Sequence, residues 1–591
     1  MHAALLALAL AASPPAAAQA APAPAREDAT GDARVVTLDA MRAELSRSME
    51  RLRLQGYEAP YFLAYQVKES LRHEVAARYG ALFADDSRRE RTLYVDLRVG
   101  SYEFDSSGDD ENVLVLGQDG PSWFASKEAP LDGDPTALRN ALWLATDERY
   151  KEALASYFKK KSREVYKPAE PDRAPSFTRE EPVRQVAPEV SFPFDAERWK
   201  AASREITLLF RDHAEIFDAS LKVQAERQVR WFASSEGHAV ITESAIYGIH
   251  LSAVTRAPDG QLLEDGRDFY ARTEAGLPTR EVLAGAVREV VAELEALRRA
   301  PAIDPYTGPA ILEPEATGVL FHEAVGHRLE GERLDDDKEG QTYRGQIGRM
   351  VLPPFLTIVD DPTLDAVNGV ALNGRYDVDD QGVRSRRTVL VRDGKLETYL
   401  LSRKPVKPFT HSNGHGRSQG SRQPMARMSN LVVESSKRVP AAELKKMLMA
   451  EARRQGKPYG LVIRDITGGN TNTMSWGYQA FKGTPRLVYR VDATTGKEEL
   501  VRGVELVGTP LASINKVVAT GETQKVFNGY CGAESGYVPV STVAPSALVG
   551  EIELQRVAKA NDRAPLLPAP WSERPAAPPA GAPASAPGAR R

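Results

Sequence analysis

Two histidines and one glutamate lie close together in the segment His322-Glu323-Ala324-Val325-Gly326-His327. The chain has only nine histidines among its 591 residues, so this concentration is unusual. Neutral imidazoles are common ligands of Zn2+, and a carboxylate beside such a site can accept a proton from a metal-bound water. The segment therefore indicates metal-assisted hydrolysis. The alternative is an ordinary amphipathic helix that carries two unrelated histidines.

The spacing of the two histidines does not suit a regular α-helix. Five residues of α-helix correspond to about 500° of rotation, which leaves the two side chains roughly 140° apart. A single π-helical turn would close much of this gap, and such turns are common at functional sites. Gly326 is the residue best able to permit a local distortion. We therefore predict a π-helical turn between His322 and His327.

A third metal ligand is needed, because a catalytic zinc site has three protein ligands and one open position. By spacing alone, the candidates are Glu330, Glu332, Asp335 and the single cysteine, Cys531. Glycines on both sides of Cys531 would let its backbone approach a site closely, although a lone cysteine in a turn can also be a small buried residue. The residues themselves leave this choice open.

A glycine-rich basic loop at residues 413–421 contains His415, and His411 lies just before it. Both histidines could bind metal, but histidines in loops are more often exposed to solvent. We therefore expect neither to be a ligand.

The composition is typical of a soluble globular protein with several cores: 42% of residues are hydrophobic, 27% are charged and the formal net charge is −4. No basic excess points to nucleic acid as a partner. No stretch has the roughly 18 consecutive apolar residues that cross a bilayer, so we expect no membrane span. The single cysteine excludes a disulfide within the chain.

The two ends of the chain differ from the rest. Residues 1–20 contain a short apolar run followed by Ala18-Gln19-Ala20, which fits a cleavage site, and we predict a signal peptide there. We expect a disordered leader at residues 21–35 and a disordered Pro/Ala-rich tail at residues 561–591. Export would make the protein periplasmic or secreted. A cytoplasmic location is the alternative, because no lysine or arginine precedes the apolar run.

The rest of the chain is predicted to form two domains with an overall α+β fold. Residues 36–300 form an N-terminal α/β domain, in which residues 105–193 are an expanded region of loop, helix and linker. Residues 301–560 form a β-rich C-terminal domain that carries the zinc site. The predicted helices lie at residues 36–56, 138–166, 195–210, 279–299 and 440–455, and the clearest strands at 61–67 and 91–99.

The segment at residues 321–332 resembles the H-E-x-x-x-H signature of the TldD/PmbA family of metallopeptidases. Further similar segments follow in order. They lie at residues 358–362, 379–383, 392–396, 424–430, 468–469, 503–508, 531–532 and 538–540. The resemblance is good over residues 303–555 and loose over residues 36–300.

The resemblance implies a zinc-dependent peptidase of the catalytic type. It implies that His322, His327 and Cys531 are the zinc ligands and that Glu323 is the catalytic base, which activates a zinc-bound water. The five-residue spacing is the family's own. The resemblance also implies a two-chain assembly, either a homodimer or a heterodimer with a related chain.

Such an assembly would enclose a narrow groove that admits unfolded peptides and excludes folded proteins. We expect residues 413–421 and 424–430 to form its walls, with His415, Arg417, Met425 and Arg427 as substrate-binding residues. One alternative is a non-catalytic binding or assembly subunit with a structural zinc, which a fourth ligand such as Glu330 or His415 would favour. The other is a zinc hydrolase of non-peptide substrates.

Overall fold

The structure is a computed structural model that describes residues 32–107, 127–164, 174–335, 339, 341–471, 481–508, 513–557 and 563–572. The predicted signal peptide, the leader up to residue 31 and most of the predicted tail lie outside the described residues, as do parts of the expanded region. The α+β fold class and the β-rich C-terminal region are confirmed. In the part of the chain that the structure describes, no helix has the length and apolar character needed to cross a membrane.

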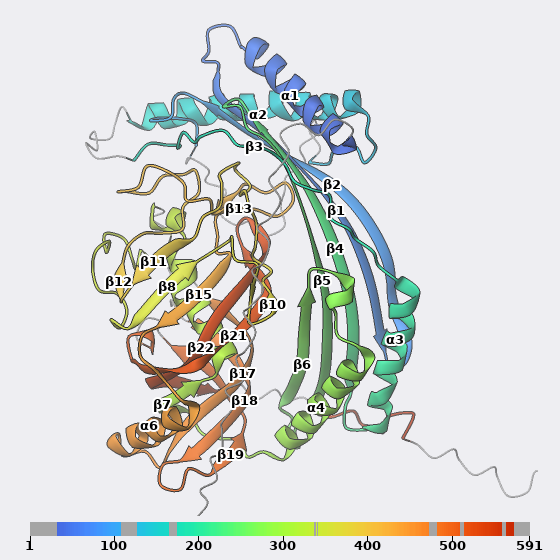
Figure 1. Cartoon of the computed structure of the whole chain (residues 1–591), viewed down its shortest axis with the longest axis vertical. Coiled ribbons are helices and arrows are strands. Elements are labelled where there is room, and N and C mark those ends of the chain that lie inside the picture. Colours follow the sequence, from blue (N-terminus) through green and yellow to red (C-terminus); the bar gives the residue numbers. More distant parts are fainter. Residues whose placement is uncertain are drawn as a thin grey trace, which may run out of the picture.

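The N-terminal region is built on a curved sheet of long, mostly antiparallel strands (Figure 1). Its order is β2-β1-β4-β5, and β5 also pairs with β3 and β6 along its other edge. The strands are β1 (Pro60–Arg78), β2 (Ala81–Val99), β3 (Arg184–Val186), β4 (Asp218–Ser234), β5 (Ala239–Arg256) and β6 (Leu262–Ala271).

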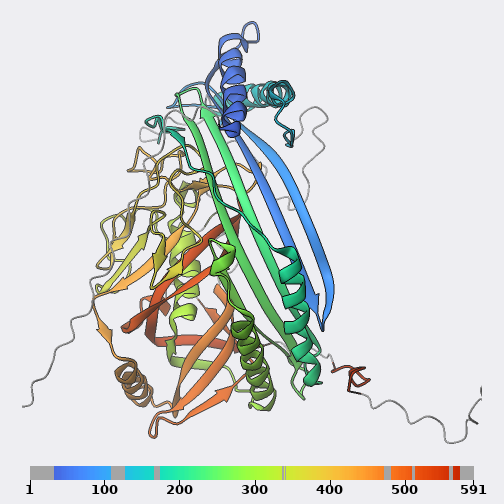
Figure 2. The same cartoon turned by 45° about the vertical axis from the view of Figure 1, so that its right-hand side comes forward.

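Four helices cover one face of this sheet (Figure 2). They are α1 (Ala33–Arg51), α2 (Pro135–Glu164), α3 (Ala196–Leu208) and α4 (Arg280–Arg299). One core lies between the sheet and the pair α1 and α2, and a second lies between the sheet and the pair α3 and α4. Asp195 caps the N-terminus of α3, because its side chain accepts a hydrogen bond from the Arg198 N–H at 3.0 Å.

Within the expanded region at residues 105–193, the described segment after residue 173 is packed and is not the linker that was expected there. Residues 184–186 form β3, which runs parallel to β5. Phe177 is only 2% exposed and packs against Phe62 at the boundary between the two sheets. Proline and charge content did not reveal this packed segment, because its packing depends on contacts with β1 and β5, which are distant in the chain.

The C-terminal region contains a mixed sheet of twelve strands among the described residues. Its main path is β12-β11-β8-β15-β22-β20-β18-β17-β7. The bounds of the twelve strands are β7 (Tyr306–Leu312), β8 (Leu356–Asp360), β11 (Thr388–Arg392), β12 (Lys395–Leu396), β15 (Asn430–Ser435), β16 (Arg438–Val439), β17 (Tyr459–Thr471), β18 (Phe481–Asp492), β19 (Glu498–Val501), β20 (Val504–Gly508), β21 (Val517–Ala533) and β22 (Gly536–Arg556).

Two helices pack on this sheet, and two short hairpins flank it. The helix α5 (Pro314–Phe321) packs against β17, β21 and β22, and α6 (Ala441–Arg454) packs against a separate apolar cluster. The hairpins are β9 (Ala366–Val367) with β10 (Val370–Ala371), and β13 (Gly416–Arg417) with β14 (Met425–Ala426). The largest core of the protein surrounds α5, which places that helix deep inside the C-terminal region.

The two regions meet through the face of the N-terminal sheet that carries no helices. Asp380, from a loop of the C-terminal region, accepts a hydrogen bond from Lys68 of β1 at 3.1 Å and one from Arg230 of β4 at 2.5 Å. These three side chains are almost completely buried. A buried charge cluster therefore ties the loop to the middle of the N-terminal sheet.

Candidate metal centre

The helix that carries the two histidines changes its pitch at the first of them. α5 ends at Phe321, and His322–Gly326 form a π-helical turn, labelled η3. The N–H of His327 donates to the carbonyl of His322, which is the five-residue hydrogen bond of a π-turn. The short helices η4 (His327–Leu329) and η5 (Gly331–Asp335) follow. The predicted π-helical turn is confirmed.

Gly326 serves this turn in a different way from the one predicted. Its φ of −54° and ψ of −58° are ordinary helical values that any residue can adopt. A Cβ atom at this position would lie 2.0 Å from the Sδ atom of Met428. The glycine therefore provides space for a neighbouring side chain and not conformational freedom.

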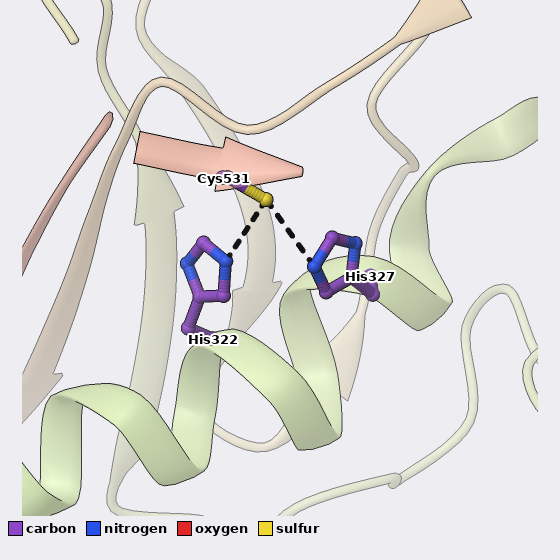
Figure 3. A group of neighbouring side chains, drawn as sticks. All are labelled: His322, His327 and Cys531. Atoms are coloured by element: carbon purple, nitrogen blue, oxygen red, sulfur yellow. Dashed lines mark hydrogen bonds between the residues drawn. The ribbon is translucent and has the colours of Figure 1, made fainter. Parts of the chain in front are cut away.

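The π-turn brings the two imidazoles to one sulfur atom (Figure 3). The Nε2 atom of His322 lies 3.2 Å from Cys531 Sγ, and the Nε2 atom of His327 lies 3.3 Å from it. All three candidate ligand atoms lie within 4.8 Å of one another. Cys531 lies in β21, opposite Val538 of β22, and not in a turn as its sequence suggested. The strand and the helix thus hold the three groups together from two sides.

Charge favours a thiolate in this cluster. Burial alone would raise the pKa of the Cys531 thiol, but His327 and His322 beside it hold that pKa well below its usual range. Burial alone would lower the pKa of each imidazole, but Cys531 raises both pKa values. A sulfur anion with two imidazole nitrogens suits zinc, and three protein ligands leave a fourth position open. The residues present therefore fit the ion.

Glu330 contacts the far side of one histidine ring. Its Oε2 atom lies 3.2 Å from His327 Nδ1 and accepts a hydrogen bond from Arg333 Nε at 2.7 Å. Burial would raise the pKa of the Glu330 carboxyl, but His327 and Arg333 lower it to a very acidic range. A carboxylate at Nδ1 keeps the proton on that nitrogen and leaves Nε2 free to bind a metal. Glu330 is therefore placed to orient His327.

Arg427 connects this carboxylate to the cysteine strand. Its Nη2 atom donates to the backbone carbonyl of Cys531 at 2.7 Å, and its Nε atom lies 3.4 Å from Glu330 Oε1. It also donates to the Gly536 carbonyl and the Ser535 hydroxyl, each at 2.9 Å. The buried guanidinium thus holds two parts of the centre in place, a role that the sequence did not reveal.

Glu323 follows His322 in the π-turn and is 8% exposed. Its backbone carbonyl accepts a hydrogen bond from Arg328 Nη1 at 2.7 Å. Among the described residues, its carboxylate has no hydrogen-bonding or ion-pair partner. This side chain is therefore free to bind a water or a substrate group.

Glu332, another of the sequence-based ligand candidates, contacts groups outside the cluster. Glu332 accepts hydrogen bonds from the Ser402 hydroxyl and, at 3.2 Å, from the Ala426 N–H. The side chain of Asp335 lies outside the described residues. Glu330 and Glu332 are the nearby carboxylate alternatives to Cys531 whose side chains the structure describes. Both contact other protein groups.

The predicted groove residues occupy contrasting environments. His415 is completely buried, contrary to the expectation for a loop histidine, and its ring contacts Asn413 Oδ1 at 2.9 Å and Asp360 Oδ1 at 3.1 Å. Arg417 donates to the carbonyls of Met428 and Pro539 at 2.6 and 2.8 Å. Met425 lies in β14 and is partly exposed. Substrate binding by these residues and by Arg427 remains a prediction.

The C-terminal region of the chain matches a known protein family. Residues 305–556 match the family described as the PmbA/TldA metallopeptidase C-terminal domain. A metalloprotease of Archaeoglobus fulgidus is 30% identical over 327 residues, which are 54% of this chain and 69% of that protein. A metalloprotease of Methanothermobacter thermautotrophicus is 30% identical over 334 residues, 54% of this chain and 66% of that protein. The chain therefore belongs to the TldD/PmbA family of metallopeptidases.

A more distant relative and two solved structures extend this comparison. The zinc metalloprotease TldD homolog of Saccharolobus solfataricus is 24% identical over 362 residues, 60% of this chain and 74% of that protein. TldE from Thermococcus kodakarensis has a TM-score of 0.54 at 15% identity, over 87% of this chain and 100% of its own. A candidate modulator of a DNA gyrase from Thermotoga maritima has a TM-score of 0.58 at 14% identity, over 87% and 99%. At these identities the structures share the fold alone.

Proposed function

We propose that this protein is a zinc-dependent peptidase that hydrolyses unfolded peptides. The observation that supports this most directly is the convergence of His322, His327 and Cys531 within 4.8 Å, with Glu323 next to the first of them. These three residues would hold the ion. When bound, zinc would polarise a peptide carbonyl and make a water molecule more acidic.

Glu323 would act as the proton carrier in this reaction. A carboxylate can accept the proton of the attacking water and later transfer it to the leaving amine. The absence of a protein partner for this carboxylate, within the described ranges, supports the assignment, because a carboxylate engaged in an ion pair would be a weaker base. Glu330 and Arg427 would hold His327 and the cysteine strand in position.

The alternative of a structural zinc requires a fourth protein ligand. The two residues that would favour it contact other groups: Glu330 contacts Nδ1 of His327, and His415 contacts Asp360 and Asn413. No feature of the described residues favours this alternative. A non-peptide substrate remains the second alternative, which cleavage assays decide.

The direct test combines metal analysis with peptide cleavage. The purified protein should contain one zinc per chain and should cleave an unfolded peptide, as followed by mass spectrometry, and a chelator should stop the cleavage. The Cys531→Ala variant should lose most of its zinc. Full zinc retention in that variant would remove Cys531 from the ligand set, and cleavage that survives complete zinc removal would refute the proposed activity.

We also propose that two chains assemble around the active site, either as a homodimer or with a related chain. Support comes from the family resemblance. Light scattering of the purified protein, alone and after mixing with a related chain, measures this directly. A fully active monomer would contradict the assembly.

Export is proposed on the composition of residues 1–20 alone. The mature protein should then begin after Ala20 and be found outside the cytoplasm. N-terminal sequencing of native protein tests this. An intact Met1 on protein recovered from the cytoplasm would end the proposal.

A further inference from the structure

The outer edge of β5 has a gap in its pairing. β3 covers this edge at Ala239–Ile241, and β6 covers it from Tyr247 onward. The five residues between them, 242–246, have no main-chain partner on this side among the described residues. The carbonyl of Ile241 accepts a hydrogen bond from the Ala187 N–H at 2.9 Å, so the main-chain groups of Ile241 point toward this outer edge. Because the main-chain groups of successive strand residues point to opposite edges, the N–H and C=O groups of Glu243 and Ala245 also point toward the outer edge.

A cavity of about 340 Å³ lies along this gap. All five gap residues line it, together with groups from the C-terminal region such as Asn373 and Arg375. β5 and β6 form the side of the N-terminal sheet nearest the C-terminal region (Figure 1). None of the candidate metal ligands lines the cavity, but Val538 does, and it pairs with Cys531 across the β21–β22 hairpin.

Two buried donors in the cavity wall lack a protein partner. They are Nε of Arg230 and Nδ2 of Asn373, and their residues are 6% and 3% exposed. A buried N–H without an acceptor costs free energy, so a ligand or a water oxygen is expected at each. These two positions in the wall, which also carries five carboxylates, can therefore receive acceptor oxygens.

A cation near one of these donors favours an anionic group. Arg272 follows β6 and donates to the carbonyl of Leu372, the residue before Asn373. Within the described residues, no hydrogen bond or ion pair joins Arg272 to a carboxylate, and Asp365, which acts on it electrostatically, forms its ion pair with Arg375. Its neighbour Arg375 is neutralised by Asp365 and Asp377, each at 2.8 Å. Arg272 is thus a cation without an ion-paired carboxylate at the β6 end of the gap.

We propose that this gap binds the carboxyl-terminal end of an extended peptide. Its main chain would pair with Glu243 and Ala245, parallel to β5 in the same direction as β3. Its terminal carboxylate would contact Arg272 and Asn373. Five residues of strand span about 16 Å, so four or five peptide residues would fill the gap. The inference goes beyond the proposed hydrolysis, because it concerns binding at a place other than the metal centre.

The test measures binding of a fluorescein-labelled pentaalanine, labelled at its N-terminus, to the full-length protein by fluorescence anisotropy. The Glu323→Gln background prevents turnover. The peptide with a free carboxylate should bind about tenfold or more tightly than its carboxamide, because a hydrogen bond to a charged group is worth at least that much. Arg272→Gln and Asn373→Leu should each weaken binding by about tenfold.

A blocking variant and a matched control keep the result interpretable. Ser244 is exposed and lines the cavity, so Ser244→Trp should fill the space without disturbing the fold and should abolish binding. Arg78→Gln alters an exposed arginine of the same sheet outside the cavity and should have no effect. Thermal melting checks that every variant is folded.

Three outcomes would overturn the proposal. They are equal binding of the carboxylate and the carboxamide, unchanged binding in the folded Ser244→Trp variant, and loss of binding in His322→Ala. The first two would leave a cavity filled only by water, and the third would place the peptide at the metal centre. Peptide binding that persists after zinc removal would support the proposed binding site even if no hydrolysis is found. A failure of the proposed binding site can therefore be distinguished from a failure of the proposed peptidase activity.

Discussion

Glu323 separates metal binding from catalysis, because it adjoins a candidate ligand without belonging to the ligand cluster. Glu323→Gln keeps the size and hydrogen-bonding capacity of the side chain but removes its ability to accept a proton. Zinc content should therefore stay near that of the parent protein, and peptide cleavage should fall by about 10²–10⁴-fold. Metal analysis and mass spectrometry of the cleaved peptide measure the two quantities.

Two results would contradict this assignment. Loss of zinc would make Glu323 a ligand or an orienting group. Unchanged cleavage would mean that another group acts as the base. The His322→Ala variant provides the comparison, since it should lose both zinc and cleavage.

Glu330 should control how tightly zinc is held, because it contacts the nitrogen of His327 that faces away from the cluster. Glu330→Gln should reduce zinc affinity by about 10–100-fold, as measured by competition with a chelator. Glu332→Gln is a matched control, since this partly buried carboxylate contacts Ser402 and not a histidine, and the zinc affinity of this variant should not change. Equal losses in both variants would show that buried charge in general, and not the contact with His327, is responsible.

The sequence predicted the ligand cluster only through the ordered resemblance to a known family. Spacing alone left Glu330, Glu332, Asp335 and Cys531 as equal candidates for the third ligand. The role of Arg427 was beyond prediction, because it depends on β21 lying beside the histidine helix. No local pattern encodes contacts between segments so far apart in the chain.

At the scale of elements, the π-turn depends on the contact between Gly326 and Met428. Gly326→Ala would place a methyl group 2.0 Å from the present position of Met428 Sδ. Relieving this overlap should lower stability by about 1–3 kcal/mol and weaken zinc binding. Thermal unfolding and chelator competition measure the two effects.

A second substitution tests the cause. Met428→Ala removes the side chain that the new methyl group would meet. The double variant Gly326→Ala/Met428→Ala should therefore lose less stability than the sum of the two single losses. If the stability losses of the two single variants simply add in the double variant, the alanine at position 326 acts through the backbone and not through contact with Met428.

The sequence predicted the helices better than the strands. Apolar periodicity located α1 and α4, because each of these helices buries one stripe against a sheet. The helices α2, α3 and α6 were also predicted. The strands β1 and β2 were predicted only in their apolar halves, at residues 61–67 and 91–99, although both extend to a turn at Tyr79 and Gly80. The polar halves are held by main-chain pairing along the hairpin, which leaves no hydrophobic signature.

At the scale of the whole molecule, the charge cluster at Asp380 joins the two regions. Asp380→Asn would leave the buried Lys68 and Arg230 without their carboxylate, which should destabilise the protein by about 3–5 kcal/mol. Asp377→Asn is the matched control on the same loop, because Asp377 is half exposed and its pairing is worth less than about 1 kcal/mol. Urea unfolding compares the two, and similar losses would contradict a joining role for Asp380.

The same cluster predicts an acid sensitivity. Burial would raise the pKa of the Asp380 carboxyl, but Lys68 and Arg230 hold it far below the ordinary value of 3.8. The folded state therefore binds this proton less readily than the unfolded state. The stabilisation is present above about pH 4 and is lost as the pH falls toward the depressed pKa. Acid unfolding of Asp380→Asn should show a weaker pH dependence in that range than the parent protein.

The π-turn has a consequence for how such a site can vary between chains. Its hydrogen bond from His327 to His322 returns the helix to the same side after five residues, where an α-helix does so after four. Deleting one residue between the histidines, such as Ala324, and restoring α-helical pitch would therefore leave both rings on one side. Inserting one residue and changing from α-helical to π-helical pitch have opposite effects on the direction of the second imidazole. Two chains with different spacing between the histidines can therefore present the same pair of imidazoles to one metal ion.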